Sequence, residues 1–324
     1  MIEQILSHAK ASHYSGESLT SRGFNKALVS VVLLSYNRPD LLNEALASLV
    51  HQSYRNLDIT VVDNRSAAST EVAHIVSQYP NVKLIQCALN LGYAGGMNEG
   101  IASASGHYVH LTEDDVVLES DCIQRLVEYL EENPSADLIA PIIYNKTAGT
   151  IRCAGGTFEL SGVYRRIIYG AGEPDTGQFP KAFEVNYIDG ASMFARRAFW
   201  ECFKGFREEY FMYVDAVELC ARVAKSDKRM TIVPEAKVYH FEPEVGSTPA
   251  ALEFHKLKNF FSLYLLHAPA HVLPEFICRY AIINGLRSLF RRNGSRPKVF
   301  FKALLWAGLN APTILKERHR QGSY

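Results

Sequence analysis

The chain has 324 residues, of which 48% are hydrophobic, and its 34 basic and 34 acidic side chains cancel to a formal net charge of zero. These values are ordinary for a globular protein with a large core. No run of about 18 apolar residues occurs, so a membrane span is not expected. The N-terminus lacks a signal-peptide pattern and the six cysteines include no C-x-x-C pair, so we expect a cytoplasmic protein with reduced cysteines.

Apolar runs of strand length alternate with segments of helical periodicity throughout residues 28–141, after a polar, serine-rich stretch at 1–26. The expected strands are 27–37, 57–63, 82–87, 107–112 and 136–141, and the expected helices are 38–52, 69–79, 93–105 and 122–133. Near-continuous apolar runs are typical of strands buried on both faces. The alternation predicts an α/β fold with an open, mostly parallel sheet flanked by helices, in which ligands bind beyond the carboxyl ends of the strands.

Polar residues follow three of these strands, at 35–37, 63–64 and 113–115. The third group contains three consecutive acids, Glu113, Asp114 and Asp115, whose charges repel one another unless a cation offsets them. A hard cation held by carboxylates and by phosphate oxygens would do so. The acids alone leave two other interpretations open, a solvated turn and an N-cap for the helix that follows.

Seven segments, in this order along the chain, resemble the family 2 glycosyltransferases, which have the GT-A fold. Within that family they are most similar to rhamnosyltransferase-like and galactofuranosyltransferase-like members. They are 29–49, 59–66, 90–101, 110–119, 189–200, 205–223 and 238–247, the last four reading HLTEDDVVLE, DGASMFARRAFW, GFREEYFMYVDAVELCARV and VYHFEPEVGS. The resemblance covers roughly residues 28–250. It implies a GT-A catalytic domain at 27–250, preceded by an N-terminal polar segment at 1–26.

The resemblance also implies which residues contact the donor nucleotide sugar. They are Ser35, Tyr36, Asn37, Arg38, Asp63, Gly92, Asn98, Asp114 and Asp189. Asp63 matches the acid that reads a pyrimidine base, since a carboxylate accepts from the base N–H. Gly92 and Asn98 belong to the loop near the ribose and diphosphate, and Asp189 is a candidate contact for a sugar hydroxyl. A helix cap at Asp63 and an ordinary turn at Gly92 are the structural alternatives.

The metal-binding D-x-D motif of the family falls on Glu113-Asp114-Asp115, with Glu in the first position. The resemblance implies that Glu113 and Asp115 bind Mn²⁺ or Mg²⁺, Asp115 most directly, and that His240 completes the site. The cation would stabilise the charge of the departing nucleoside diphosphate. An imidazole ligand favours Mn²⁺ over Mg²⁺.

The general base is where the chain departs from the family pattern. Relatives carry Glu-Asp after the aromatic run, and here Asp215 takes the Glu position while Ala216 takes that of the usual base. Three hypotheses remain open at this point. Asp215 acts as the base after a small backbone shift, Glu218 contributes from one helical turn further on or instead binds the acceptor or the helix end, or the chain is catalytically impaired. Asp215 could also simply cap the helix that contains Glu218.

The C-terminal region, 251–324, is expected to be helical and basic, since ten Lys or Arg and only two acids follow residue 269. One interpretation is a helical subdomain packed on the catalytic core. The other is a peripheral contact with the inner face of the cytoplasmic membrane, through Phe300, Phe301 and Trp306 beside Lys298 and Lys302. No motif supports nucleic-acid binding. The oligomeric state is left open.

We therefore expect an inverting, metal-dependent glycosyltransferase. It would move a sugar from a nucleoside diphosphate donor, dTDP-rhamnose or a UDP-sugar, to a hydroxyl of a cell-surface glycan or lipid-linked acceptor. The alternative is a degenerate glycosyltransferase that binds nucleotide sugar or a partner without catalysis, which Ala216 and Glu113 keep open. A nucleotidyltransferase is disfavoured because "SYNRPD" after the first strand has no Gly-rich phosphate loop.

Overall fold

The structure is a computed structural model that describes residues 27–162, 164–241, 250–279 and 296–321. The predicted N-terminal segment at 1–26 and most of the last motif, from residue 242 onward, lie outside the described residues. The predicted alternation of strands and helices over 28–141 is confirmed.

Twelve strands and nine α-helices are described, with two short 3-10 helices. The strands are β1 (Val29–Ser35), β2 (Leu57–Asp63), β3 (Val82–Gln86), β4 (Tyr108–Glu113), β5 (Val116–Leu118), β6 (Leu138–Asn145), β7 (Ile151–Cys153), β8 (Gly156–Glu159), β9 (Arg165–Ile168), β10 (Phe183–Val185), β11 (Ser192–Arg196) and β12 (Met230–His240). The helices are α2 (Pro39–Val50), α3 (Ser69–Ser77), α4 (Gly92–Ser103), α5 (Cys122–Glu132), α6 (Arg197–Phe203), η4 (Glu208–Tyr210), α7 (Asp215–Val223), α8 (Ala250–His267), η5 (Ala270–Val272), α9 (Leu273–Phe276) and α11 (Arg296–Gln321).

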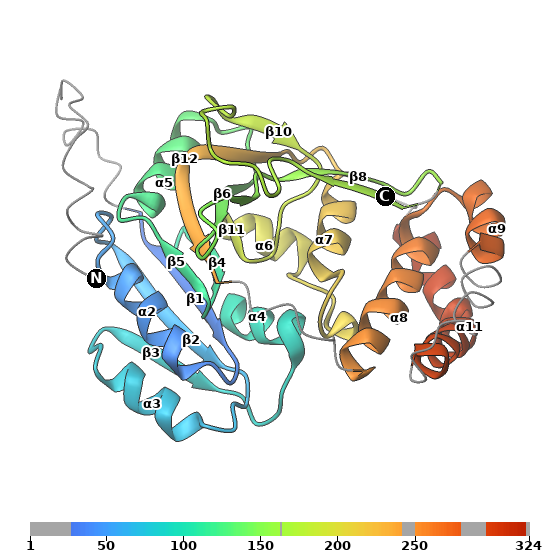
Figure 1. The fold of residues 1–324 in the computed structure, drawn as a ribbon, viewed down its shortest axis with the longest axis horizontal. Coiled ribbons are helices and arrows are strands. Elements are labelled where there is room, and N and C mark those ends of the chain that lie inside the picture. Colours follow the sequence, from blue (N-terminus) through green and yellow to red (C-terminus); the bar gives the residue numbers. More distant parts are fainter. Residues whose placement is uncertain (1–26, 163, 242–249, 280–295, 322–324) are drawn as a thin grey trace.

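The main sheet has the strand order β10-β12-β6-β11-β4-β1-β2-β3, with β5 and β7 paired to β12 and β6 (Figure 1). Strands β4, β1, β2 and β3 are mutually parallel, and β6 is parallel to β12. Strand β11 runs antiparallel between β4 and β6, so it joins the two parallel groups. The mixed, mostly parallel sheet with flanking helices is the predicted GT-A-like architecture.

The local sequence explains the first βα unit. All seven residues of β1 are buried, which matches its continuous apolar run. Helix α2 begins at Pro39, where a missing backbone N–H has no cost, and buries Leu42, Ala45, Leu46 and Leu49 at helical spacing. The chain steps in one direction from β1 to β3 and returns to β4 on the far side of β1, so α2 and α3 share a face and α4 covers the other.

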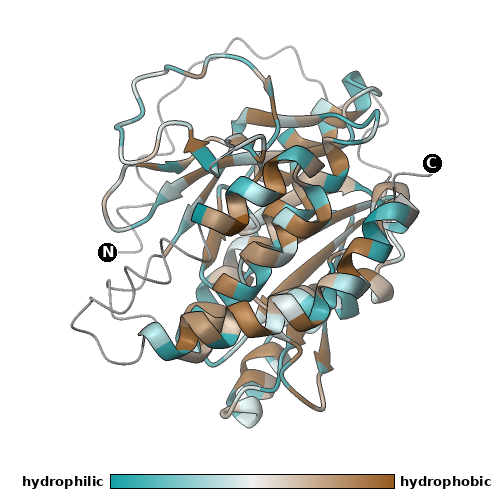
Figure 2. Cartoon of the chain, turned by 90° about the vertical axis from the view of Figure 1, so that its right-hand side faces the viewer, coloured by the Kyte–Doolittle hydropathy of each residue, from teal (hydrophilic) through white to brown (hydrophobic). Residues whose placement is uncertain are grey.

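The C-terminal helices form a layer beside α7, at the right of Figure 1. Helix α8 packs against α7 on one side and against α11 on the other. Figure 2 views this end of the molecule, where apolar and hydrophilic segments alternate around the helices, as expected for amphipathic packing. Within the part of the chain that is described, no helix is long and apolar enough to cross a membrane.

Candidate active site

The carboxyl ends of β1, β2 and β4 lie next to one another at one edge of the sheet. In the parallel ladders Ser35 pairs with Asp63, and Leu34 pairs with Glu113. The polar groups that follow three separate strands in the sequence are therefore neighbours in space. This is the edge at which open α/β sheets bind ligands.

The two aspartates that follow β4 are buried and share one arginine. Asp114 and Asp115 are 4% and 2% exposed. The guanidinium of Arg38 pairs with Asp115 and lies 3.6 Å from Oδ1 of Asp114. The backbone N–H of Tyr36 donates to Oδ2 of Asp114 at 3.0 Å. The loop after β1 therefore lies directly over the acid cluster.

The negative charge at this edge exceeds what one guanidinium offsets. Burial raises the pKa of Asp114 to about 7, and the charge of Asp115 adds to this while the Tyr36 N–H and Arg38 oppose it. Burial likewise raises the pKa of Glu113 well above its ordinary value, helped by the charges of Asp115, Asp189 and Asp114. A buried group of carboxylates of this kind is suited to a multivalent cation.

Strand pairing brings His240 to the same place. Strand β12 runs antiparallel to β5 and pairs His240 with Val116, so Nε2 of His240 lies 3.5 Å from Oδ1 of Asp115. That buried oxygen accepts no hydrogen bond. A carboxylate oxygen and an imidazole that converge fit Mn²⁺ or Mg²⁺. In the described ranges, however, no three His, Cys, Asp or Glu side chains are arranged as a metal site.

Asp63 has one carboxylate oxygen engaged and one without a partner. Oδ1 accepts from the backbone N–H of Ser66 at 2.9 Å, whereas Oδ2 is buried and has no hydrogen-bond partner. The next helix, α3, starts only at Ser69, so Asp63 stabilises the turn after β2 and does not cap that helix. The remaining oxygen is available to an N–H donor such as a nucleobase, in line with the predicted contact.

The loops after β1 and β2 are tied together beside Asp63. The backbone N–H of Asn37 donates to Oγ of Ser66 at 2.9 Å, and Oδ1 of Asn37 accepts from the N–H of Ala67 at 2.7 Å. Asn37 adopts a left-handed backbone, with φ of 58°, which asparagine tolerates better than most residues. Tyr36 is 41% exposed, so it forms the rim of the site.

Gly92 and Asn98 pack α4 against the segment that leads to α7. A Cβ at Gly92, whose φ is +71°, would lie 2.1 Å from the carbonyl oxygen of Phe211, so only glycine fits there. The Asn98 amide donates to the carbonyl of Phe206 at 2.8 Å, and its oxygen accepts the Phe206 N–H at 2.8 Å. The structure thus gives both residues a packing role, and their contact with the donor stays a prediction.

Asp189 is held as an ionised carboxylate. Its Oδ2 lies 3.3 Å from the guanidinium of Arg152 and accepts from the Tyr187 hydroxyl at 3.2 Å, while Oδ1 accepts the Ala191 N–H at 3.1 Å. Burial alone would raise the pKa of Asp189, but Arg152 and the Ala191 N–H outweigh it, so the pKa is lowered. A fixed carboxylate with this orientation can accept a sugar hydroxyl.

Asp215, the first residue of α7, has the properties of a general base. Oδ1 accepts the N–H of Ala216 at 2.8 Å, and Oδ2 is buried without a partner. Burial raises the pKa of Asp215 to about 7, the Ala216 N–H opposes the shift, and the charge of Asp189 adds to it. A pKa near neutrality and a free oxygen are what proton abstraction from a hydroxyl requires.

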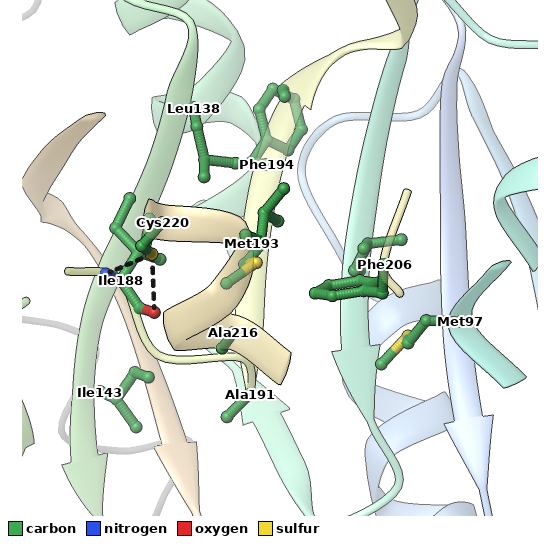
Figure 3. Packing of buried hydrophobic residues seen from close by; sticks show 14 of the residues in the cluster. Met97, Leu138, Ile143, Ile188, Ala191, Met193, Phe194, Phe206, Ala216 and Cys220 are labelled. Atoms are coloured by element: carbon green, nitrogen blue, oxygen red, sulfur yellow. Dashed lines mark hydrogen bonds between the residues drawn. The ribbon is translucent and has the colours of Figure 1, made fainter. Parts of the chain in front are cut away.

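Ala216, at the position of the usual family base, lies within the hydrophobic core near Ala191 and Met193 (Figure 3). A Cβ added at Gly190 would come within 3.5 Å of the Ala216 Cβ and 2.8 Å from the hydroxyl oxygen of Tyr93. The Ala216 side chain is therefore in apolar surroundings and closely packed against the segment that leads into β11. The carboxylate at this end of α7 that keeps an unpartnered oxygen is that of Asp215.

Glu218 is fully buried in an ion network. Its carboxylate accepts from Arg207, Arg222 and His267, each at 2.9 Å. Burial would raise the pKa of Glu218, but Arg222 and His267 outweigh it, so the pKa is lowered. A carboxylate with two cationic partners and a third hydrogen-bond partner is a poor base, and its position instead connects α7 to α8. The structure therefore favours a structural role over the predicted catalytic contribution.

Arg152 and His267 were missed by sequence reasoning although they set the charge state of two acids. Arg152 pairs with Asp189, 37 positions along the chain, and His267 pairs with Glu218 across 49 positions. Neither belongs to a recognisable motif, because a partner brought in by packing leaves no local pattern.

The model of glycosyl transferase family 2 matches residues 30–203, which is more than half of the chain. The chain belongs to this family. The members of glycosyl transferase family 2 are inverting transferases that use nucleotide-sugar donors, so this protein is a glycosyltransferase of that kind. The match ends before Asp215 and His240, so these residues lie outside it.

Relatives of this glycosyltransferase include the N-acetylglucosaminyl-diphospho-decaprenol L-rhamnosyltransferase of Mycobacterium tuberculosis, which is 26% identical over 265 residues. The alignment covers 75% of this chain and 85% of that protein. The amylovoran biosynthesis glycosyltransferase AmsB of Erwinia amylovora is 36% identical over 109 residues, which cover 32% of this chain and 36% of that protein.

Solved structures share the fold at low sequence identity. GalNAc-T7 with UDP, GalNAc and Mn²⁺ has a TM-score of 0.64 at 15% identity, and the match covers 78% of this chain and 50% of that one. A mannosyltransferase from Pyrobaculum calidifontis with GDP-Man and Mn²⁺ has a TM-score of 0.54 at 16% identity. The match covers 99% of this chain and 87% of that one. S. aureus TarS 1–349 with UDP has a TM-score of 0.54 at 18% identity and covers 92% of both chains. These likenesses show a GT-A-like fold.

Proposed function

We propose that this glycosyltransferase is an active, metal-dependent enzyme that uses dTDP-rhamnose or a UDP-sugar and glycosylates a hydroxyl of a cell-surface glycan or lipid-linked acceptor. The observation that carries the proposal is the set of buried carboxylate oxygens that accept no hydrogen bond, on Asp63 and Asp115 at the edge of the sheet and on Asp215 at the start of α7. Unsatisfied buried acceptors are costly unless a ligand uses them. The rhamnosyltransferase relative and the UDP-bound neighbour support the choice of donor.

In the donor half of the site, Asp63 Oδ2 would accept an N–H of a pyrimidine base beside the loop at 35–38. Asp115 and His240 would hold Mn²⁺ or Mg²⁺, which supplies electrostatic stabilisation of the departing diphosphate. Glu113 and Asp114 contribute negative charge that favours this cation. Arg38, 41% exposed at its side chain, lies close enough to the acid pair to contact a phosphate of the donor as well.

In the acceptor half, Asp215 would remove the proton of the attacking hydroxyl through Oδ2. The acceptor oxygen bonds to the anomeric carbon while the bond from that carbon to the diphosphate oxygen breaks, and attack opposite the leaving group inverts the configuration. Asp189, ionised and fixed by Arg152, would orient a sugar hydroxyl. Glu218 would act only through its ion network, by holding α7 in place.

The test is a donor screen on the purified full chain. Nucleoside diphosphate release would be measured from dTDP-rhamnose, UDP-galactofuranose, UDP-glucose, UDP-N-acetylglucosamine and GDP-mannose, with and without Mn²⁺. Mn²⁺-dependent release from one pyrimidine donor, lost in Asp215→Asn and kept in Asp227→Asn, a variant of an exposed aspartate, supports the proposal. Nucleotide binding without release in every condition would favour the alternative, a degenerate binding protein.

We also propose a peripheral contact with an anionic lipid surface, in which Phe301 keeps its predicted place while Leu305 and Leu309 replace Phe300 and Trp306. Phe300 is only 6% exposed, and the Trp306 ring lies under the ammonium of Lys258, 5.0 Å from it, so both pack inward. The outward face of α11 instead exposes three large apolar side chains at intervals of four. Phe301, Leu305 and Leu309 are 43%, 64% and 73% exposed.

Charge on the same helix supports a lipid partner. The exposed residues of α11 include Lys298, Lys302 and Lys316, and none of its residues classed as exposed is acidic. Its one acid, Glu317, is partly buried and pairs with Arg207. Apolar side chains flanked by lysines are typical of helices that lie on anionic membranes. A partner protein with an acidic groove would be the competing occupant.

Co-sedimentation with vesicles tests this contact. We expect binding to phosphatidylglycerol vesicles, weak binding to phosphatidylcholine vesicles, and loss of binding in Leu305→Ser/Leu309→Ser. The matched control is Leu89→Ser, a change of similar exposure (62%) far from α11 in the chain, which should bind as well as the unmodified chain. Absence of binding to either vesicle, or equal binding by the α11 variant, would overturn the lipid assignment.

A further inference from the structure

The turn immediately before Asp215 has an unusual backbone. Between η4 and α7, Phe211, Tyr213 and Val214 have φ values of 61°, 66° and 66°. Residues other than glycine rarely adopt positive φ, and a β-branched residue such as valine is a genuine outlier. A segment of this kind persists only when its surroundings hold it, and it is common at functional sites.

One buried side chain on α8 holds this loop. Nδ2 of Asn259 donates to the carbonyl oxygens of Tyr210, Met212 and Tyr213 at 2.6, 2.9 and 2.8 Å. Asn259 is 1% exposed. Three carbonyls of one short turn therefore converge on one amide group, and each would lose this partner if the amide were removed.

Neighbouring contacts fix the other end of the turn. The carbonyl of Phe211 accepts the N–H of Ala94, and the Phe211 ring stacks on that of His255 with centroids 4.6 Å apart. The ammonium of Lys258 donates to the carbonyl of Glu209. The turn is thus clamped between α4 and α8, and Asn259 is the contact that reaches the residues immediately before Asp215.

We infer that Asn259 is a positioning residue for the general base, an inference that rests on the proposed role of Asp215. The amide keeps the three residues with positive φ in place, and their conformation sets the direction in which α7 begins. If the turn relaxed to ordinary φ values, the carboxylate would move relative to the donor site. A displacement of about 1 Å costs about 100-fold in rate in comparable cases. The C-terminal helices would then complete the active site, beyond the family-matched region at 30–203.

The test compares Asn259→Leu and the milder Asn259→Ser with the unmodified full chain. We expect kcat to fall by about tenfold to 100-fold while the donor KM changes by less than about twofold. Hydrogen exchange of the amides at 211–216, measured without substrate, should become faster. The matched control is Asn310→Ala, which removes the hydrogen bond that the Asn310 side chain donates to the carbonyl of Trp306 (2.7 Å) on α11. It should change neither kcat nor the exchange at 211–216.

A rescue variant separates positioning from a general loss of structure. Val214→Gly removes the cost of the left-handed backbone, so adding it to Asn259→Leu should restore part of the lost kcat. Normal kcat despite faster exchange, or unchanged exchange at 211–216, would overturn the inference. If Asp215→Asn itself keeps full turnover, the proposed base fails, whereas the exchange measurement still reports whether Asn259 holds the loop.

Discussion

Asp215→Asn is expected to abolish turnover and yet to stabilise the fold. The side chain is 7% exposed, and burial raises its pKa from an ordinary 3.8 to about 7, with a further contribution from Asp189. Because the pKa is raised in the folded state, the ionised carboxylate destabilises the fold. This cost is absent well below pH 3.8, grows as the pH rises toward 7, and is constant above it. Asparagine cannot ionise and avoids the cost.

The magnitude follows from the two pKa values. Their difference corresponds to about 4 kcal/mol of unfolding free energy at pH 8 and to about 1.5–2 kcal/mol at pH 5. An unpartnered amide in place of Oδ2 costs about 1–3 kcal/mol at any pH. We therefore expect the stability of Asp215→Asn relative to the unmodified chain to increase by about 2–3 kcal/mol between pH 5 and pH 8.

Urea unfolding at pH 5 and pH 8, with nucleoside diphosphate release at the same pH values, measures both effects. Turnover of the unmodified enzyme should rise with pH through about 7 as Asp215 loses its proton. Asp227→Asn, at an exposed position, serves as the control and should show neither effect. A stability difference that does not vary with pH would refute the buried-charge argument. Full turnover in Asp215→Asn would refute the assignment of the base.

Three further substitutions test other parts of the site. Arg38→Ala removes the cation that pairs with Asp115, so Mn²⁺ alone should bind more tightly by calorimetry, and unchanged affinity would show that Arg38 does not compete for the acids. Asp63→Ala should raise the donor KM by about tenfold or more with a smaller effect on kcat, and the reverse pattern in steady-state kinetics would exclude base recognition. Glu218→Gln leaves Arg207, Arg222 and His267 without their shared anion and should cost about 3–5 kcal/mol in urea unfolding, whereas a loss below about 1 kcal/mol would contradict a structural role.

Much of the fold and part of the site could be read from local sequence. Continuous apolar runs placed β1, β2 and β4, and parallel pairing then required that Ser35, Asp63 and Glu113 meet at one edge. This works because strand burial and helical periodicity leave a pattern within a few residues. The resemblance of the ordered motifs to the family, which is confirmed over 30–203, predicted the kind of reaction.

The choice among acids required the tertiary structure. Asp215 and Glu218 lie three positions apart on one helix, and the sequence shows the charge state of neither. Packing gives Glu218 two cationic partners and the imidazole of His267, and it leaves Asp215 with a free oxygen and a pKa near 7. Charge state depends on partners brought in from elsewhere in the chain, which is why the predicted contribution of Glu218 was not separable from that of Asp215.

What the sequence by itself determined is the order of strands and helices over 28–141, the edge at which the acids gather and the family. What only the tertiary structure decided is which groups are already occupied. Arg38 reaches Asp115 across 77 positions, and Asn259 reaches the turn before Asp215 across 46 to 49. The outward face of α11, with Leu305 and Leu309 in place of Trp306, was set by packing on α8. The physical reason is that periodicity records burial along one element, whereas a partner far along the chain is chosen by the way whole elements pack.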